Sequence, residues 1–302
     1  MNKKQNTVNK KIIFSGIGLH TGEVSNMIVH PAPVNTGIIF KRIDLKTPIT
    51  IPAKVRYVVE TNRGTTIGVD DIKIYTVEHF LSALSGIGID NAMIEIDNIE
   101  PPIFDGSSKP FIDKILECGI KEYSVSEHSI TVLEAIEYFD NKCKIEIIPH
   151  SEFKITYYAN FNYGNIGQQS YSYTLDNNYI NEISKARTFC SIGELIYLKK
   201  NGLIKGGSLE SGLVFLDKNI NKKETLDILS EFNINYESLD NKNNTLNGIK
   251  LNYANEPSRH KILDLIGDFA LLGASLKGHV ISYGGGHEAN VKIMKKIKLI
   301  YG

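Results

Sequence analysis

Three side chains that could bind or support a metal recur four residues apart: His260, Asp264 and Asp268. On an α-helix, residues four apart lie on one face, about 6 Å apart along the axis. An imidazole and a carboxylate one turn apart can share a metal ion, whereas Asp268, about 12 Å from His260 along the axis, is better placed to orient another group. The alternative interpretation is that His260 and Asp264 form only a surface hydrogen bond.

The stretch that carries these side chains is predicted to be helical. Its apolar residues recur at helical spacing between Ile262 and Leu272. Pro257 suits the first turn of a helix, where its missing N–H is not needed. We therefore predict a helix over residues 257–272.

Glu78 and His79 form a second candidate group. Thr76 suits an N-cap position, and the apolar stripe that follows it ends at Gly86, so both side chains are expected in the first turn of a helix. Catalytic groups are often presented at such a position. The alternative is that Glu78 only interacts favourably with the helix dipole, beside a capping histidine.

Two further histidines lie in or after glycine-rich segments. His20 stands in the loop Gly16–Gly22, which has three glycines in seven residues, and its alternative interpretation is an ordinary surface histidine. His287 follows Gly284–Gly286, so its ring is expected on a tightly turned loop with room around it. A glycine triplet could also bind phosphate, as in a small-molecule kinase.

The elements that must position these groups follow one plan in both halves of the chain. Short strands come first and helices follow, which favours two α+β domains of one architecture, although no strict sequence repeat is present. The polar stretch at 121–127 separates them, giving predicted domains 1–123 and 124–302. The predicted strands are 11–14, 26–30, 37–41 and 91–97, then 129–133, 143–148 and 153–158. Between the second set of strands and the helix at 257–272, an excursion at 193–216 carries apolar residues that could line a groove or form a small satellite core.

Composition excludes several classes of protein. The chain has 302 residues, and its 34 Lys and Arg balance 34 Asp and Glu, so no bulk charge favours nucleic acid. Its three cysteines lack a CxxC spacing, which argues against disulfides or a thiolate metal site. No apolar run of about 18 residues predicts a membrane span. No signal peptide or heptad pattern is recognisable, so we expect a cytoplasmic monomer.

Seven motifs in order resemble the UDP-3-O-acyl-N-acetylglucosamine deacetylases, metal-dependent amidases of lipid A biosynthesis in Gram-negative bacteria. The resemblance covers about residues 10–299. The motifs are Gly-x-Gly-Leu-His-Thr-Gly (16–22), Thr-Val-Glu-His (76–79), Asp-Gly-Ser-Ser-x-Pro-Phe (105–111), Ala-Arg-Thr-Phe (186–189), Gly-Gly-Ser-Leu-Glu (206–210), Arg-His-Lys-x-Leu-Asp-x-x-Gly-Asp (259–268) and Gly-Gly-His (285–287).

The resemblance implies a fold of two similar βααβ-type sandwich domains, each with a small insert, and an active site between them. It also implies the catalytic groups. His79, His260 and Asp264 would bind Zn²⁺, with Fe²⁺ as an alternative that suits the same ligands. Glu78 would be the general base. His287 would be protonated, with Asp268 orienting it, so that it stabilises the oxyanion and then protonates the leaving amine.

The resemblance further implies residues that bind the substrate, UDP-3-O-acyl-N-acetylglucosamine. Thr188 would assist the oxyanion, and Lys261, expected on a different side of the helix from His260, would contact the phosphate region. Phe161 would stack on uracil. Leu19, Phe189 and the excursion 193–216 correspond to the acyl passage, and His20 would also bind the substrate.

Two segments depart from the family pattern. The loop 283–287 has glycines where many relatives carry a basic residue, and the Asn- and Lys-rich stretch 241–247 has no assigned role. Two other interpretations remain open, a small-molecule kinase and a binding protein that kept the fold without turnover. The kinase interpretation leaves the set of His79, His260 and Asp264 unexplained. A binding protein would not require a competent residue at every catalytic position, and this sequence has one at each.

Overall fold

The computed structural model describes residues 3–164, 166–176, 178–217, 221–234, 236, 239 and 244–302. Of the Asn- and Lys-rich stretch at 241–247, the first three residues lie outside this set. The remainder includes a 3₁₀ turn at Leu246–Gly248.

The first half of the chain forms a sheet with the strand order β2-β3-β9-β4-β5. Strands β4 and β9 are parallel, and the other neighbours are antiparallel. Helix α1 (Glu78–Gly86) precedes β9, and α2 (Lys109–Cys118) follows it. The strands are β2 (Ile12–Ile17), β3 (Val24–Pro31), β4 (Ile38–Arg42), β5 (Ile49–Pro52) and β9 (Ala92–Ile96).

The second half repeats this topology. Its sheet has the order β12-β13-β18-β14-β15, in which β14 and β18 are parallel and the other neighbours are antiparallel. Helix α6 (Glu256–Ala270) precedes β18 and α7 (His287–Tyr301) follows it. Strand β11 (Ser129–Thr131) pairs with β18 outside this order. The strands are β12 (Ile136–Phe139), β13 (Lys144–Ile148), β14 (Phe153–Phe161), β15 (Gly167–Thr174) and β18 (Ser275–Tyr283).

Each half also has an insert at the same topological position. The insert lies between β5 and α1 in the first half and between β15 and α6 in the second. The first insert is a small antiparallel sheet of β6 (Val58–Glu60), β7 (Thr66–Val69) and β8 (Ile72–Ile74). The second insert, residues 189–248, contains the predicted excursion 193–216. Its elements are β16 (Phe189–Ser191), α4 (Ile192–Lys200), β17 (Leu213–Phe215) and α5 (Lys222–Glu231). A short helix, α3 (Tyr179–Glu182), precedes it. The predicted α+β fold of two similar domains with inserts is therefore confirmed.

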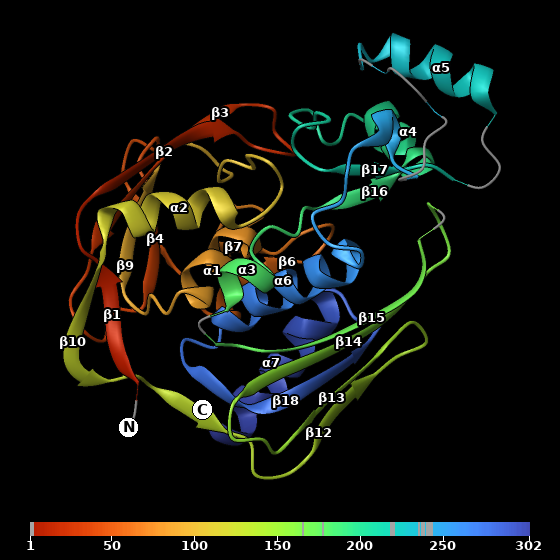
Figure 1. Ribbon diagram of the computed structural model, residues 1–302. Coiled ribbons are helices and arrows are strands. Elements are labelled where there is room, and N and C mark those ends of the chain that lie inside the picture. The colour runs from red at the N-terminus through yellow and green to blue at the C-terminus, as the bar shows by residue number, and fades with distance from the viewer. Residues whose placement is uncertain are drawn as a thin grey trace.

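Helices α1, α6 and α7 lie between the two sheets, and α1 of the first half meets α6 of the second (Figure 1). One continuous hydrophobic core includes residues from both sheets and from these helices. Phe14, Phe80 and Phe111 pack edge to face within it, with ring centroids 5.1 to 6.3 Å apart. Such ring pairs contribute about 0.5–1.5 kcal/mol each beyond their buried area. The second insert has a separate small core, as one of the two sequence interpretations predicted.

The boundary between the halves is crossed by a two-stranded ribbon. Strand β1 (Lys4–Val8) pairs with β10 (Ile120–Ser126), and the second sheet follows directly. The predicted boundary between residues 123 and 124 falls within β10 and stays a prediction.

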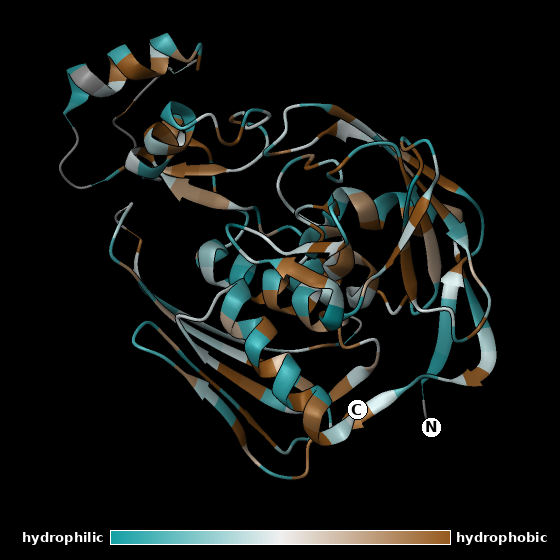
Figure 2. Cartoon of the chain, turned by 180° about the vertical axis from the view of Figure 1, so that it is seen from behind, coloured by the Kyte–Doolittle hydropathy of each residue, from teal (hydrophilic) through white to brown (hydrophobic). Residues whose placement is uncertain are grey.

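Two local expectations are wrong. Thr76 does not cap α1, because its backbone has φ 52° and its hydroxyl donates to Glu100 Oε1 at 2.8 Å; the helix begins at Glu78 after Val77. His287 does not lie on a loop but is the first residue of α7. Brown and teal segments alternate along this amphipathic helix in Figure 2, and it buries residues such as Ile293 and Ile297.

Candidate metal centre and active site

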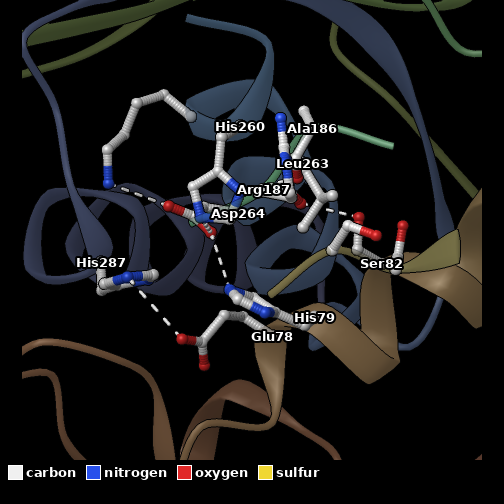
Figure 3. Close-up of polar contacts among 12 residues, drawn as sticks. Glu78, His79, Ser82, Ala186, Arg187, His260, Leu263, Asp264 and His287 are labelled. Carbon is white, nitrogen blue, oxygen red and sulfur yellow. Dashed lines mark hydrogen bonds and ion pairs between the residues drawn. The ribbon is translucent and has the colours of Figure 1, made fainter. Parts of the chain in front are cut away.

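The site lies where α1 and α6 cross. Gly267 of α6 faces the backbone of Glu78, so closely that a Cβ atom there would overlap the Glu78 carbonyl. Ser82 of α1 donates a hydrogen bond to the carbonyl oxygen of Leu263 at 2.7 Å, which ties the two helices together (Figure 3). The first turn of α1 is thereby held against the polar stripe of α6.

His79, His260 and Asp264 converge at this crossing. Asp264 Oδ1 lies 3.2 Å from His260 Nε2 and 3.6 Å from His79 Nε2. One ligand atom from each residue lies within 4.8 Å of the others, and all three residues are buried. Figure 3 shows the side chains approaching one another from α1 and α6. These residues could therefore hold one metal ion.

The chemistry of this cluster fits a divalent cation. The Ala186 carbonyl accepts a hydrogen bond from His260 Nδ1 at 3.0 Å, so the lone pair of Nε2 faces Asp264. Burial lowers the pKa of His260 to about 3. Asp264 Oδ1 and His79 Nδ1 are buried and find no hydrogen-bond partner among the described residues. A neutral imidazole and a carboxylate that face each other this closely repel unless a cation lies between them.

Asp264 is held ionised by its surroundings. Burial alone would raise the pKa of its carboxyl group, but the neighbouring Lys261 ammonium group helps to hold that pKa well below its usual range. Lys261 Nζ donates to Asp264 Oδ2 at 3.0 Å. The expectation that Lys261 faces a different side of the helix from His260 is therefore wrong: its flexible stem returns the ammonium group to the site, where it also lies 5.6 Å from the ring centroid of Phe189.

Glu78 lies beside the cluster at the start of α1. Its side chain is 2% exposed, and Oε2 accepts a hydrogen bond from the backbone N–H of Thr65 at 2.9 Å. Burial raises the pKa of its carboxyl group, against the opposing charges of His287 and His79. A carboxylate of raised pKa next to a metal ligand can act as a general base.

His287 and Asp268 form an ion pair opposite Glu78. His287 Nδ1 donates to Asp268 Oδ2 at 2.9 Å, and His287 Nε2 lies 3.9 Å from Glu78 Oε1. Burial alone would lower the pKa of the imidazole, but the Asp268 carboxylate raises it to about 10. The structure thus contains the contact that the four-residue spacing of Asp268 indicated, and His287 can carry a proton at neutral pH.

A cavity of about 260 Å³ opens onto these groups. Much of its polar lining comes from α1, α6, α7 and the loop that holds Arg63. Leu19, His20, Thr188 and Phe189, all expected near the substrate, line it as well. Its apolar lining comes largely from the second insert: Leu195, Leu198, Ile204, Leu209, Leu213, Val214 and Ile234. The cavity therefore joins the polar cluster to an apolar channel.

Phe161, expected to contact the substrate, does not line this cavity. It is 8% exposed and packs edge to face against Phe189 and Tyr163, with ring centroids 5.4 and 6.0 Å apart. Tyr163 and Phe189 line the cavity instead.

Sequence reasoning missed the residues that support the site. Thr65 donates its hydroxyl to Asp268, and Asn290 donates to the same carboxylate. Glu100, 1% exposed, accepts the backbone N–H groups of His20 and Thr21 and so holds the glycine-rich loop. Apart from the contact between Asn290 and Asp268, these contacts join residues that are far apart in the chain. No local sequence pattern therefore predicts them.

No helix in the described part of the chain is long and apolar enough to cross a membrane.

Comparison with known proteins is consistent with this architecture. The chain matches the family described as UDP-3-O-acyl N-acetylglycosamine deacetylase over residues 5–240 and 237–298. It is 36% identical to the UDP-3-O-acyl-N-acetylglucosamine deacetylase of Idiomarina loihiensis, covering 97% of this chain and 89% of the relative. The enzyme of that name from Myxococcus xanthus is 35% identical, with 97% and 86% covered.

A longer relative is also similar. The "Bifunctional enzyme LpxC/FabZ" of Chlorobaculum tepidum is 38% identical over 298 residues, which are 97% of this chain. This chain spans 64% of the length of that relative. The family match and the extent of these similarities agree with the motif resemblance, and the chain belongs to the UDP-3-O-acyl N-acetylglycosamine deacetylase family.

Proposed function

We propose that this chain is a metal-dependent hydrolase that removes the N-acetyl group of UDP-3-O-acyl-N-acetylglucosamine, giving UDP-3-O-acyl-glucosamine and acetate in lipid A biosynthesis. The names of the relatives support the substrate. The observation that carries the chemistry is the buried cluster of His79, His260 and Asp264, with Glu78 on one side and the His287–Asp268 pair on the other.

The three clustered side chains would hold Zn²⁺, with Fe²⁺ as the alternative, because two imidazoles and one carboxylate suit both ions. When bound, such an ion supplies Lewis acidity: it polarises the amide carbonyl and lowers the pKa of water from about 15.7 to about 7.

Glu78 and His287 would divide the proton transfers. Glu78 takes a proton as the water oxygen attacks the amide carbon, and its burial favours accepting that proton. His287, kept charged by Asp268, stabilises the negative oxygen and then donates its proton to the amine nitrogen as the C–N bond breaks. The water oxygen ends in acetate. These steps leave Glu78 protonated and His287 neutral, so passage of a proton from Glu78 to His287 restores both side chains for the next turnover.

The remaining cavity residues would bind and orient the substrate. The Thr188 hydroxyl would donate to the developing oxyanion, a contact worth about 100- to 1000-fold in rate. Lys261 would contact the phosphate region and His20 would bind the substrate. Leu19, Phe189 and the excursion 193–216 would surround the acyl chain. Phe161, which packs against Phe189, would stack on uracil.

The kinase interpretation gains no support from the glycine triplet. A Cβ on Gly285 would contact the Ser282 hydroxyl at 2.5 Å and Ile145 at 2.9 Å, so that glycine is required for packing. We also propose a monomeric state without nucleic-acid partners, from the balanced charge and the absence of heptads in the sequence. A cytoplasmic location is proposed from the family to which the chain belongs.

Acetate release from UDP-3-O-acyl-N-acetylglucosamine tests the function directly. The matched control is UDP-N-acetylglucosamine without the acyl chain, which should react poorly because it cannot fill the apolar lining. ATP hydrolysis is measured in parallel. Acetate release without ATP hydrolysis supports the proposal, whereas ATP hydrolysis without acetate release would favour the kinase.

A further inference from the structure

Thr65 contacts both proton-transferring sides of the site. It is the last residue of the segment between β6 and β7, and its side chain is fully buried. In the sequence it is far from both α6 and α7. Its backbone N–H donates to Glu78 Oε2 at 2.9 Å. Its hydroxyl donates to Asp268 Oδ1 at 2.5 Å. Thr65, in the first insert, is therefore hydrogen-bonded to the Glu78 carboxylate of α1 and to the Asp268 carboxylate of α6.

The Asp268 carboxylate depends on this hydroxyl. Its other oxygen, Oδ2, accepts hydrogen bonds from His287 Nδ1 at 2.9 Å and from Asn290 Nδ2 at 2.8 Å. Asp268 is fully buried, so every lone pair that loses its donor costs desolvation free energy. The Thr65 oxygen also lies 3.3 Å from His287 Nδ1, which leaves little room for the ring to turn.

Gly64 allows the segment to approach so closely. A Cβ at this position would lie 2.9 Å from Glu78 Oε1 and 3.6 Å from Oε2. The Thr65 N–H can reach Glu78 because the preceding residue has no side chain. The same approach places the Thr65 hydroxyl against Asp268.

We propose that Thr65 is a positioning residue for the reaction: its N–H and its hydroxyl fix the Glu78 carboxylate and the Asp268–His287 pair at the separation that the two proton transfers require. The hydroxyl keeps its own proton throughout and acts only as a donor to Asp268. This inference rests on the proposed function, since it assigns Thr65 to the geometry of that reaction.

The test compares Thr65→Val, which removes the hydroxyl and keeps the N–H and the shape, with Thr65→Ser, which restores a hydroxyl. We expect Thr65→Val to lower kcat about 10- to 100-fold while KM changes less than about threefold and the metal content stays unchanged. Thr65→Ser should recover most of the loss. Thr7→Val is the matched control, because Thr7 is also fully buried and its hydroxyl accepts the Ala32 N–H far from the site.

A readout without turnover makes the test independent of the substrate. In protein labelled with ¹⁵N-histidine, the Nδ1–H resonance of His287, assigned by its absence in His287→Gln, should shift in Thr65→Val and stay in place in Thr7→Val. An unshifted resonance and a wild-type kcat in Thr65→Val would overturn the inference, as would a Thr65→Ser variant as impaired as Thr65→Val. Absence of acetate release by the wild type would refute the proposed function alone, and the resonance would then decide the role of Thr65.

Discussion

A Cβ atom on Gly267 would overlap the carbonyl oxygen of Glu78, so α6 meets α1 backbone to backbone at the residue proposed as the general base. The distance between the helices at this point is set by the missing side chain. His79 follows Glu78, and Asp264 lies three residues, just under one helical turn, before Gly267. The closeness of the candidate metal ligands therefore depends on a glycine that is not itself a ligand.

Gly267→Ala should destabilise the protein and impair the site. Alanine in a helix interior is favoured over glycine by about 1 kcal/mol, but the clash with the Glu78 backbone should outweigh this and lower the free energy of unfolding by about 1–3 kcal/mol. Urea unfolding measures the effect. Ala270→Gly, at the end of α6, serves as the control for helix propensity, with an expected cost of about 0.5–1 kcal/mol. A Gly267→Ala protein with wild-type stability and activity would disprove the close-packing argument.

Zn²⁺ should stabilise the metal-free protein through the three clustered ligands. A ligand that binds only the folded state at 100 times its Kd adds about 2.7 kcal/mol, which should raise the melting temperature. Asp264→Ala should abolish this rise, whereas Glu288→Gln, an exposed carboxylate on α7, should keep it. Thermal melts of metal-free protein with and without Zn²⁺ provide the measurement, and an equal rise in wild type and Asp264→Ala would place the metal elsewhere.

The His287–Asp268 pair should make stability depend on pH in the alkaline range. The pKa of His287 is raised from 6.5 to about 10 in the folded protein, so folding binds its proton more tightly. Its contribution is complete below about pH 6.5 and is lost as the pH rises through about 10. In metal-free Asp268→Asn, the free energy of unfolding should therefore fall less between these values than in the wild type. Parallel slopes for the two proteins would contradict the pairing.

The apolar lining of the second insert should control which acyl chains are accepted. Leu209→Trp places a larger side chain at a cavity-lining position, and we expect kcat/KM for a long-chain substrate to fall about 10-fold or more, with a smaller effect on a short-chain substrate. Leu203→Trp is the control, because Leu203 is exposed in the same insert and does not line the cavity. Equal losses for both chain lengths would argue against an acyl channel here.

The fold and the candidate metal ligands were largely accessible from sequence, because they follow helical or strand periodicity. His260, Asp264 and Asp268 share a face of α6 by their spacing alone, and the order of strands and helices predicted the repeated architecture. His79 could be added only through motif resemblance, since the crossing of α1 and α6 is a tertiary contact that no local pattern encodes.

Other features depend on contacts that the local sequence does not reveal. Thr76 has the composition of an N-cap, yet its hydroxyl is used by Glu100, 24 residues away, which overrides the local preference. Thr65 reaches Asp268 across 203 residues. The start of α7 could not be predicted, because the glycines before His287 indicate a turn and not the helix that follows it. The position of the Lys261 ammonium group could not be predicted, because its long side chain bends toward the helix face that carries Asp264.

The most direct test of the account is metal content measured together with acetate release in the wild type, His79→Ala and Glu78→Ala. We predict about one metal ion per wild-type chain and release of acetate, and loss of both in His79→Ala. Glu78→Ala should keep its metal while turnover falls about 10²- to 10⁴-fold, because its carboxylate moves a proton and does not bind the ion. A metal-free wild type that stays active in chelator, or a Glu78→Ala protein that loses metal as His79→Ala does, would contradict it.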